Sequence, residues 1–162
     1  MKVLFGKLFL SSAMALGSVT MEAASAQCVK LTFRTYGQTC AFFNQAATLS
    51  PAYDGSTCVM TLTLGRSQTC CNTFLTGQFL FLSTRPISPG IQDPLLVPGC
   101  LLSVVPDFVL PLPQSSGGIV KLPIPPTLVN LTFYAQGLND YLTTIGLTHD
   151  YQTSQGLSIA IF

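Results

Sequence analysis

Proline and glycine interrupt this chain throughout its length, and no feature constrains the fold more. The sequence has 11 Pro and 13 Gly, which leave no amphipathic stretch of helical length after residue 26. Proline cannot donate to a β-ladder and glycine tolerates positive φ, so clusters of the two mark turns and strand ends. Apolar runs recur between these clusters at spacings of roughly 8–15 residues, which is typical of an all-β protein.

The apolar runs themselves have the two-residue period of strands. In residues 58–64 the apolar even positions alternate with Thr61 and Thr63, which predicts a half-buried strand. Residues 131–136 and 157–161 alternate in the same way. Residues 77–83 form a continuous apolar run, which favours a strand buried on both faces. Further strands are expected at 29–35, 101–105, 107–110, 118–122 and 142–147. We therefore expect an antiparallel sandwich, jelly-roll-like, of about eight or nine strands.

The first 26 residues have the pattern of a secretory signal peptide. Lys2 and Lys7 supply a positive start, and residues 8–19 form a short apolar segment. Ala24-Ser25-Ala26 then supplies the small residues that signal peptidase needs, which predicts cleavage before Gln27. The sequence therefore divides into a signal peptide over 1–26 and a single β-sandwich domain over 27–162.

Two other interpretations of the leader fit less well. A membrane anchor needs about 20 consecutive apolar residues, whereas Ser11, Ser12 and Glu22 interrupt this segment. A lipoprotein would need a lipobox, and the residues before Cys28 lack its leucine and place a bulky glutamine next to the cysteine. The sequence thus predicts a chain without a membrane span, secreted or retained in the periplasm or at the cell surface.

Charge is unusually sparse and excludes one class of partner. Charged residues make up 8% of the chain, against about 25% in typical proteins. Cleavage of the leader removes two lysines and the single glutamate, which leaves a mature domain of net charge near zero. Nucleic-acid binding needs clustered Lys and Arg side chains to displace counterions from phosphates. The few cations here are scattered, so we do not expect a nucleic-acid partner.

All of the cysteines follow the leader, so export would place them in an oxidising compartment where disulfides form. An even number in an oxidising compartment favours three disulfides over metal binding or catalysis. The spacings lack the C-x2-C pairs of zinc sites. Neighbours on a strand point to opposite faces, so Cys70 and Cys71 are expected to bridge to different partners. Six cysteines allow 15 pairings. The candidates are Cys28, Cys40, Cys58, Cys70, Cys71 and Cys100.

Four segments carry a resemblance to a known family. They are Tyr36-Gly37-Gln38-Thr39-Cys40, Pro98-Gly99-Cys100, Ile124-Pro125 with Leu131-Thr132-Phe133-Tyr134-Ala135-Gln136, and Ser154-Gln155-Gly156-Leu157. In their order they resemble a family of secreted bacterial β-domains of unknown function, abundant in planctomycetes and myxobacteria. The resemblance implies export, a β-fold, a turn near the last segment and a Cys40–Cys100 disulfide. It implies no activity, and Gln155 stands where the family has asparagine.

Candidate catalytic residues are few. His149 and Asp150 are adjacent, but neighbours on a strand point apart and no G-x-S-x-G nucleophile motif is present. We interpret this pair as a polar strand end beside a turn over residues 151–156. Asp54, Asp93, Asp107 and Asp140 each lie beside Gly, Pro or Asn, where aspartate typically caps turns. Carboxylate pairs for glycoside hydrolysis and loop oxygens for calcium are the alternatives. No catalytic residue, metal or cofactor is predicted.

Aromatic residues offer one candidate binding surface. The chain has no tryptophan, and most of its phenylalanines are expected in the core. Tyr134, Tyr141 and Tyr151 lie on or near the last strands, where an exposed tyrosine strip would contact a protein or a cell-surface glycan. The sequence therefore favours a secreted non-catalytic module with a structural, adhesive or binding role. The alternative is a small secreted hydrolase or a carbohydrate-binding accessory domain, with a site built from loop aspartates and His149.

Overall fold

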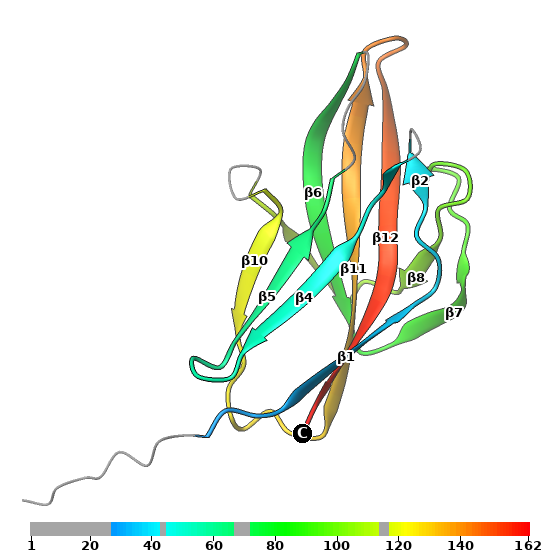
Figure 1. Ribbon diagram of the computed structural model, residues 1–162. Coiled ribbons are helices and arrows are strands. Elements are labelled where there is room, and N and C mark those ends of the chain that lie inside the picture. The colour runs from blue at the N-terminus through cyan, green and yellow to red at the C-terminus, as the bar shows by residue number, and fades with distance from the viewer. Residues whose placement is uncertain (1–26, 43–44, 67–71, 114–116) are drawn as a thin grey trace, which may run out of the picture.

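The computed structural model describes residues 27–42, 45–66, 72–113 and 117–162, and within these ranges the chain forms strands and no helix (Figure 1). All sheet pairings between the named strands are antiparallel. The strands are β1 (Leu31–Tyr36), β2 (Ala41–Phe42), β3 (Gln45–Ala46), β4 (Leu49–Asp54), β5 (Val59–Leu64), β6 (Thr73–Ser83), β7 (Pro86–Ile91), β8 (Leu102–Val104), β9 (Phe108–Pro111), β10 (Ile119–Pro123), β11 (Leu131–Thr143) and β12 (Thr148–Ile161).

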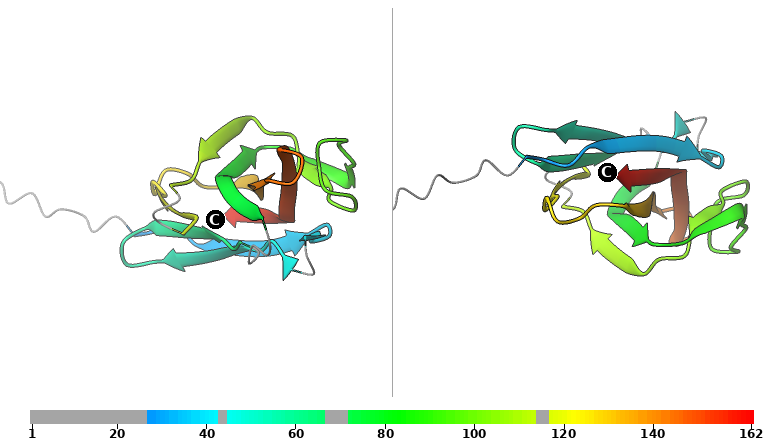
Figure 2. Two further views of the ribbon diagram at one scale, coloured as in Figure 1. Left: turned by 90° about the horizontal axis from the view of Figure 1, so that it is seen from above. Right: turned by 90° about the horizontal axis from the view of Figure 1, so that it is seen from below.

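Two sheets form the body of the molecule. The larger has the strand order β1-β12-β11-β6-β9 and the smaller has the order β10-β5-β4. Figure 2 shows β4 and β5 in a layer beside the one that contains β6, β11 and β12. Two short hairpins, β2-β3 and β7-β8, complete the fold. The all-β, antiparallel sandwich expected from the sequence is confirmed, while the jelly-roll connectivity stays a prediction.

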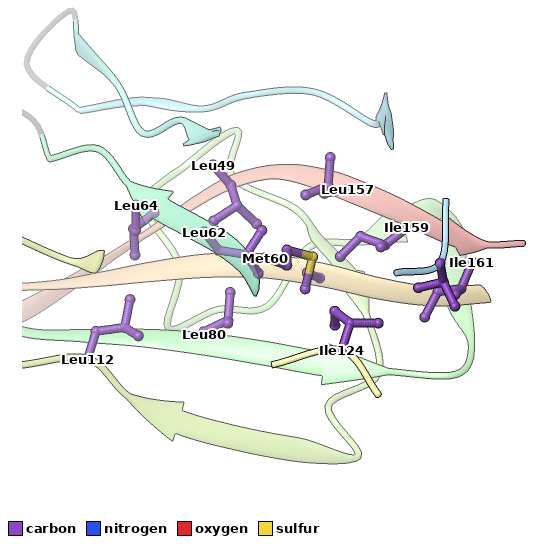
Figure 3. Close-up of a cluster of buried hydrophobic side chains, with 12 residues drawn as sticks. Leu49, Met60, Leu62, Leu64, Leu80, Leu112, Ile124, Leu157, Ile159 and Ile161 are labelled. Atoms are coloured by element: carbon purple, nitrogen blue, oxygen red, sulfur yellow. The ribbon is translucent and has the colours of Figure 1, made fainter. Parts of the chain in front are cut away.

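The core lies between the two sheets. Even-numbered residues of β5 and odd-numbered residues at the end of β12 point into it, because alternate residues of a strand face the same side (Figure 3). The buried members from these two strands are Met60, Leu62, Leu64, Leu157, Ile159 and Ile161. The alternation read from the sequence at 58–64 and 157–161 is therefore confirmed.

We define the inner face of the five-stranded sheet as the face that packs against β10-β5-β4, and the outer face as the opposite one. Consecutive residues of β11 show the division. A side chain at Gly137 would point at Leu64 of β5, on the inner face. Gln136 instead bonds to the backbone N–H of Ser103 in β8, 2.8 Å away, on the outer face. A β-bulge in the β11-β12 ladder follows directly, between Gln136 and Leu138.

The hairpin between β11 and β12 corrects two sequence predictions. Residues 142–147, expected as a strand, contain the turn, because Gly146 and Leu147 adopt φ values of 98° and 51° that reverse the chain. Residues 151–156, expected as a turn, lie inside the unbroken strand β12. The polar residues there are buried because their side chains bond to loop carbonyls. Gln152 Nε2, for example, donates to Cys40 O at 3.1 Å.

Two strands were missed where prolines were read as breaks. Pro51 lies in β4, and Pro86 and Pro89 lie in β7. β4 is an edge strand of its sheet, and β7 belongs to a two-stranded hairpin with an unpaired side. A proline on an edge costs no ladder hydrogen bond when its nitrogen faces away from the neighbouring strand.

Two disulfides link parts of the chain that are far apart in the sequence. Cys40–Cys100 is present, as the family resemblance implies, and Cys28 pairs with Cys58. Cys70 and Cys71 lie outside the described residues, so the third bridge stays a prediction. The leader over 1–26 also lies outside them. Within the described residues, no helix is long and apolar enough to cross a membrane.

Candidate functional site

An apolar cavity lies on the outer face of the five-stranded sheet, with a volume of about 250 Å³. Its floor comes from β6, β11 and β12, and its walls come from the loop after β7, from β8 and from the start of the loop that follows β8. The lining residues are Phe81, Asp93, Leu95, Leu96, Leu102, Pro106, Leu138 and Tyr151. Leucines and aromatic rings dominate, with one carboxylate and one phenol among them. Such a lining suits an apolar group with a polar end.

The wall of the cavity is fixed to the sheet at several points. Leu96 forms a parallel β-bridge with Tyr151, and the N–H of Val97 donates to Tyr151 O at 2.9 Å. Leu101 O accepts hydrogen bonds from Gln136 Nε2 at 2.8 Å and Thr153 Oγ1 at 3.0 Å. The Cys40–Cys100 disulfide ties the end of the same loop to the segment before β2. The cavity is therefore preformed rather than assembled on binding.

A histidine–carboxylate pair lies next to the cavity. The Nδ1 of His149 is 2.7 Å from Asp140 Oδ1. The His149 ring stacks on Tyr151, with ring centroids 6.2 Å apart and planes inclined by 19°. Asp140 is the more enclosed partner, because its side chain is 14% exposed against 48% for His149. Carboxylates only accept hydrogen bonds, so the Nδ1–H of His149 is the donor in this pair.

Strand register places this pair. Asp140 lies opposite Tyr151 in the β11-β12 ladder, and Leu142 lies opposite His149, so His149 and Asp140 are diagonal neighbours on the outer face. Gly77 of β6 lies on the other side of Asp140. A Cβ at Gly77 would come within 2.9 Å of the Phe79 ring, which occupies the space beside Asp140.

Asp140 was expected to cap a turn, and that prediction is wrong because the residue lies within β11, which continues to Thr143. Asp54 and Asp93 do cap turns, by accepting the backbone N–H groups of Ser56 and Leu95 at 2.9 Å each. Hydrogen bonds from Ser56 and Thr57 lower the pKa of Asp54 from 3.8 to about 2.

Asp107 joins two loops rather than capping its own turn. Its Oδ2 accepts from the Thr84 N–H and from the Ser83 hydroxyl, each at 2.9 Å. The hydrogen bonds from Thr84 and Ser83, together with nearby Arg85, lower the pKa of Asp107.

The adjacent residues His149 and Asp150 point apart, as expected. Asp150 Oδ2 accepts a hydrogen bond from the Thr143 hydroxyl at 2.7 Å, away from the His149–Asp140 pair. Within the described ranges, no group of three or more His, Cys, Asp or Glu side chains is placed to hold a metal ion.

The expected exposed tyrosine strip does not form. Tyr141 is completely buried, so that part of the prediction is wrong. Tyr134 is half-buried and packs edge-on against Tyr36, with ring centroids 5.9 Å apart. Tyr151 is the member that lines the cavity. Tyr134 and Tyr141 face opposite sides because they lie an odd number of positions apart on β11, whose residues alternate regularly.

A second concave surface lies where β1 leads towards β2. This groove has a volume of about 510 Å³ and is lined by uncharged residues. They are Thr35, Tyr36, Gly37, Gln38, Thr39 and Gln155. Tyr36 is fixed there by a hydrogen bond from its hydroxyl to Ser103 O at 3.1 Å, and burial together with Tyr134 raises its pKa to about 12. Hydroxyls and amides at a neutral surface suit an uncharged polar ligand.

Comparison with known proteins returned no match to a protein-family model, to a curated protein or to a solved structure. The function of the site is therefore inferred from the residues of this chain and their arrangement.

Sequence reasoning missed the His149–Asp140 pair for an identifiable reason. The pairing depends on recognising Thr144-Ile145-Gly146-Leu147 as the hairpin turn, after which the ladder register brings Asp140 opposite Tyr151. No pattern in the sequence predicts the wall of the cavity. Loop residues such as Leu95 and Leu96 lie against the sheet only because of contacts with residues far away in the chain.

Proposed function

We propose that this chain is an exported binding module with an adhesive or structural role outside the cytoplasm, and that its outer-face cavity receives an apolar group of the partner. The leader pattern supports export, and two disulfides are consistent with an oxidising compartment. Membership of the secreted bacterial β-domain family and a jelly-roll connectivity belong to the same proposal.

The observation that carries this function is the preformed apolar cavity. Its wall is held by a disulfide, a β-bridge and side-chain hydrogen bonds, so little conformational entropy is lost when a ligand enters. Leu95 at the cavity is 70% exposed, which leaves apolar surface in contact with water until a partner covers it.

The test uses N-phenyl-1-naphthylamine, a neutral apolar fluorophore, as the probe of the cavity. We expect saturable 1:1 binding to the mature protein and at least tenfold weaker binding to Leu95→Glu, because the new carboxylate would have to be desolvated beside the probe. Phe108→Glu is the matched control, since Phe108 is 69% exposed and lies on β9, outside the cavity lining. Equal losses in both variants, or no saturable binding, would refute the assignment of the cavity.

The adhesive role is tested on the whole protein. We expect the mature chain to co-sediment with cell-wall fractions or to associate with itself in size-exclusion chromatography with light scattering. A persistent monomer that binds neither cell walls nor glycans would contradict that role. If binding is to glycans and is lost in Gln38→Ala but not in Leu95→Glu, the polar groove is the site instead of the cavity.

The His149–Asp140 pair supports a competing function. An oriented imidazole beside a cavity supplies two of the three parts of a Ser-His-Asp arrangement. Hydrolysis of p-nitrophenyl acetate by the purified protein, abolished in His149→Ala and reduced in Asp140→Asn, would favour the hydrolase. The binding proposal expects no such activity above that of the His149→Ala variant.

A further inference from the structure

The far end of the five-stranded sheet carries exposed apolar side chains on a narrow projection. β6, β11 and β12 extend beyond the three-stranded sheet and end at the turn of residues 144–147 (Figure 1). Leu147 is 75% exposed and Ile145 is 73% exposed. Phe74, at 58%, lies beside them, opposite Leu142 in the β6-β11 ladder. We call Phe74, Ile145 and Leu147 the apolar tip.

The fold does not require these residue types. Leu147 has φ 51°, in the left-handed region that Gly, Asn and Asp occupy most readily and that strains a bulky side chain. An asparagine would close the same hairpin with less strain and without exposing apolar surface. Leucine at position 147 therefore destabilises the folded state in two ways, through backbone strain and through the exposure of apolar surface to water. Such local costs occur where a residue serves function rather than folding.

The polar groups around the tip would not oppose its transfer out of water. Residues 72–76 and 141–148 contain no charged side chain. The Thr144 N–H and hydroxyl both donate to Asn72 O, at 2.8 and 3.0 Å. The Thr143 hydroxyl is bonded to Asp150, the nearest carboxylate along β12. Paired polar groups enter an apolar phase at much lower cost than unpaired ones.

The shape of the tip discriminates among partners. A stable protein interface buries about 1,200–2,000 Å² of complementary surface, whereas the apolar tip consists of only two side chains on one turn and a third on β6. A bilayer interface needs no complementary surface, because apolar side chains enter the boundary between headgroups and acyl chains. With a net charge near zero in the mature chain, attraction to anionic lipids is not required.

We propose that the apolar tip inserts into the surface of a lipid bilayer and anchors the exported protein there reversibly, independently of the cavity. Ile145 and Leu147 enter first, and Phe74 reaches the headgroup level. Three side chains give weak attachment, comparable to or below the association constant on the order of 10⁴ M⁻¹ of a single myristoyl chain. Attachment of this strength raises the concentration of the protein at the membrane surface and remains reversible.

The experiment measures flotation of the oxidised mature protein with phosphatidylcholine vesicles at millimolar lipid. We expect binding that is insensitive to salt and unchanged when phosphatidylglycerol is added. Leu147→Asn should bind about tenfold less while its thermal stability stays equal or rises, since asparagine fits the left-handed turn position better. Phe108→Thr removes an equally exposed side chain from β9 and should bind as the wild type does.

A tryptophan reporter locates the contact. The chain has no tryptophan, so Ile145→Trp supplies the sole indole. Its emission should shift to shorter wavelength with vesicles, whereas that of Phe108→Trp should not. The proposal is overturned if the wild type does not float, if Leu147→Asn floats equally, or if both reporters shift alike. It is also overturned if the tip instead mediates a dimer that Leu147→Asn abolishes, with no vesicle binding.

Discussion

Two glycines show how a single residue can depend on distant neighbours. A Cβ at Gly137 would overlap the side chain of Leu64, and one at Gly156 would overlap the ring of Tyr36. Neither glycine needs positive φ, so neither is explained by a turn. Both are required because another part of the chain lies directly over the backbone, in one case from β5 and in the other from β1.

Gly137→Ala tests this dependence. Leu64 is fully buried and cannot move aside, so we expect a loss of about 1–3 kcal/mol in the free energy of unfolding. Urea denaturation followed by circular dichroism would measure the change. Gly55→Ala is the control, because the nearest atom to its added Cβ is 3.9 Å away, and its stability should stay within about 0.5 kcal/mol of wild type. A loss in Gly55→Ala equal to that in Gly137→Ala would argue against the steric explanation.

Asp54 gives a residue-scale prediction about pH. Its folded-state pKa of about 2 is below the ordinary value of 3.8, because Ser56 and Thr57 donate hydrogen bonds to the carboxylate. The carboxylate therefore stabilises the folded state above pH 3.8, and this contribution disappears as the pH falls through about 2.

We expect the Asp54 carboxyl carbon to titrate by NMR with a midpoint near 2. The Asp54→Ala variant should lose less stability than the wild type between pH 4 and pH 2, in a pH series of denaturant titrations. A midpoint near 3.8 for Asp54 would show that the turn hydrogen bonds do not persist in solution.

At the scale of elements, the loop between β7 and β8 depends on attachments rather than on its own secondary structure. The β-bridge from Leu96 and the hydrogen bond from Val97 attach one part of it to β12, and Cys100 attaches its end to Cys40. This loop supplies the wall of the cavity, so the two disulfides should differ in function. Cys40–Cys100 supports the cavity, whereas Cys28–Cys58 joins the chain before β1 to the chain before β5.

Removing each disulfide in turn would separate these roles. We expect Cys40→Ala/Cys100→Ala and Cys28→Ala/Cys58→Ala each to lower the free energy of unfolding by about 2–5 kcal/mol. Only the first double variant should also weaken the binding of N-phenyl-1-naphthylamine, by about tenfold or more. Fluorescence titration at a temperature where both variants are folded gives the comparison. Equal probe affinity in the two variants would mean that hydrogen bonds alone hold the wall.

At the scale of the whole molecule, the candidate surfaces lie on different parts of the five-stranded sheet. The cavity lies on its outer face and the apolar tip lies at its far end, where β11 turns into β12 (Figure 1). A module bound weakly to a bilayer through the tip would leave the cavity free for a second partner. The proposed export of this module depends on the leader.

The exported protein is expected to begin at Gln27. N-terminal sequencing or intact mass of secreted material would show this, and Ala26→Arg should cause the precursor to accumulate because signal peptidase needs a small residue there. Val19→Leu keeps the apolar segment and should be processed normally. An unprocessed chain in the wild type would instead support a membrane anchor.

The sequence by itself determined the fold class, because the two-residue period and the spacing of Pro and Gly are local properties of the backbone. It also determined the inward residues of β5 and the end of β12, where alternation is unbroken. The family resemblance correctly implied the Cys40–Cys100 disulfide.

Only the tertiary structure decided the site. The turn of residues 144–147 sets the register that brings Asp140 to His149, and regular alternation along β11 buries Tyr141. Residues 49–54 form a strand despite Pro51 because β4 lies at the edge of its sheet. Residues 151–156 lie in β12 because distant segments accept hydrogen bonds from their buried polar side chains. Local pattern specifies which backbone can form, whereas long-range contacts specify which side chains meet.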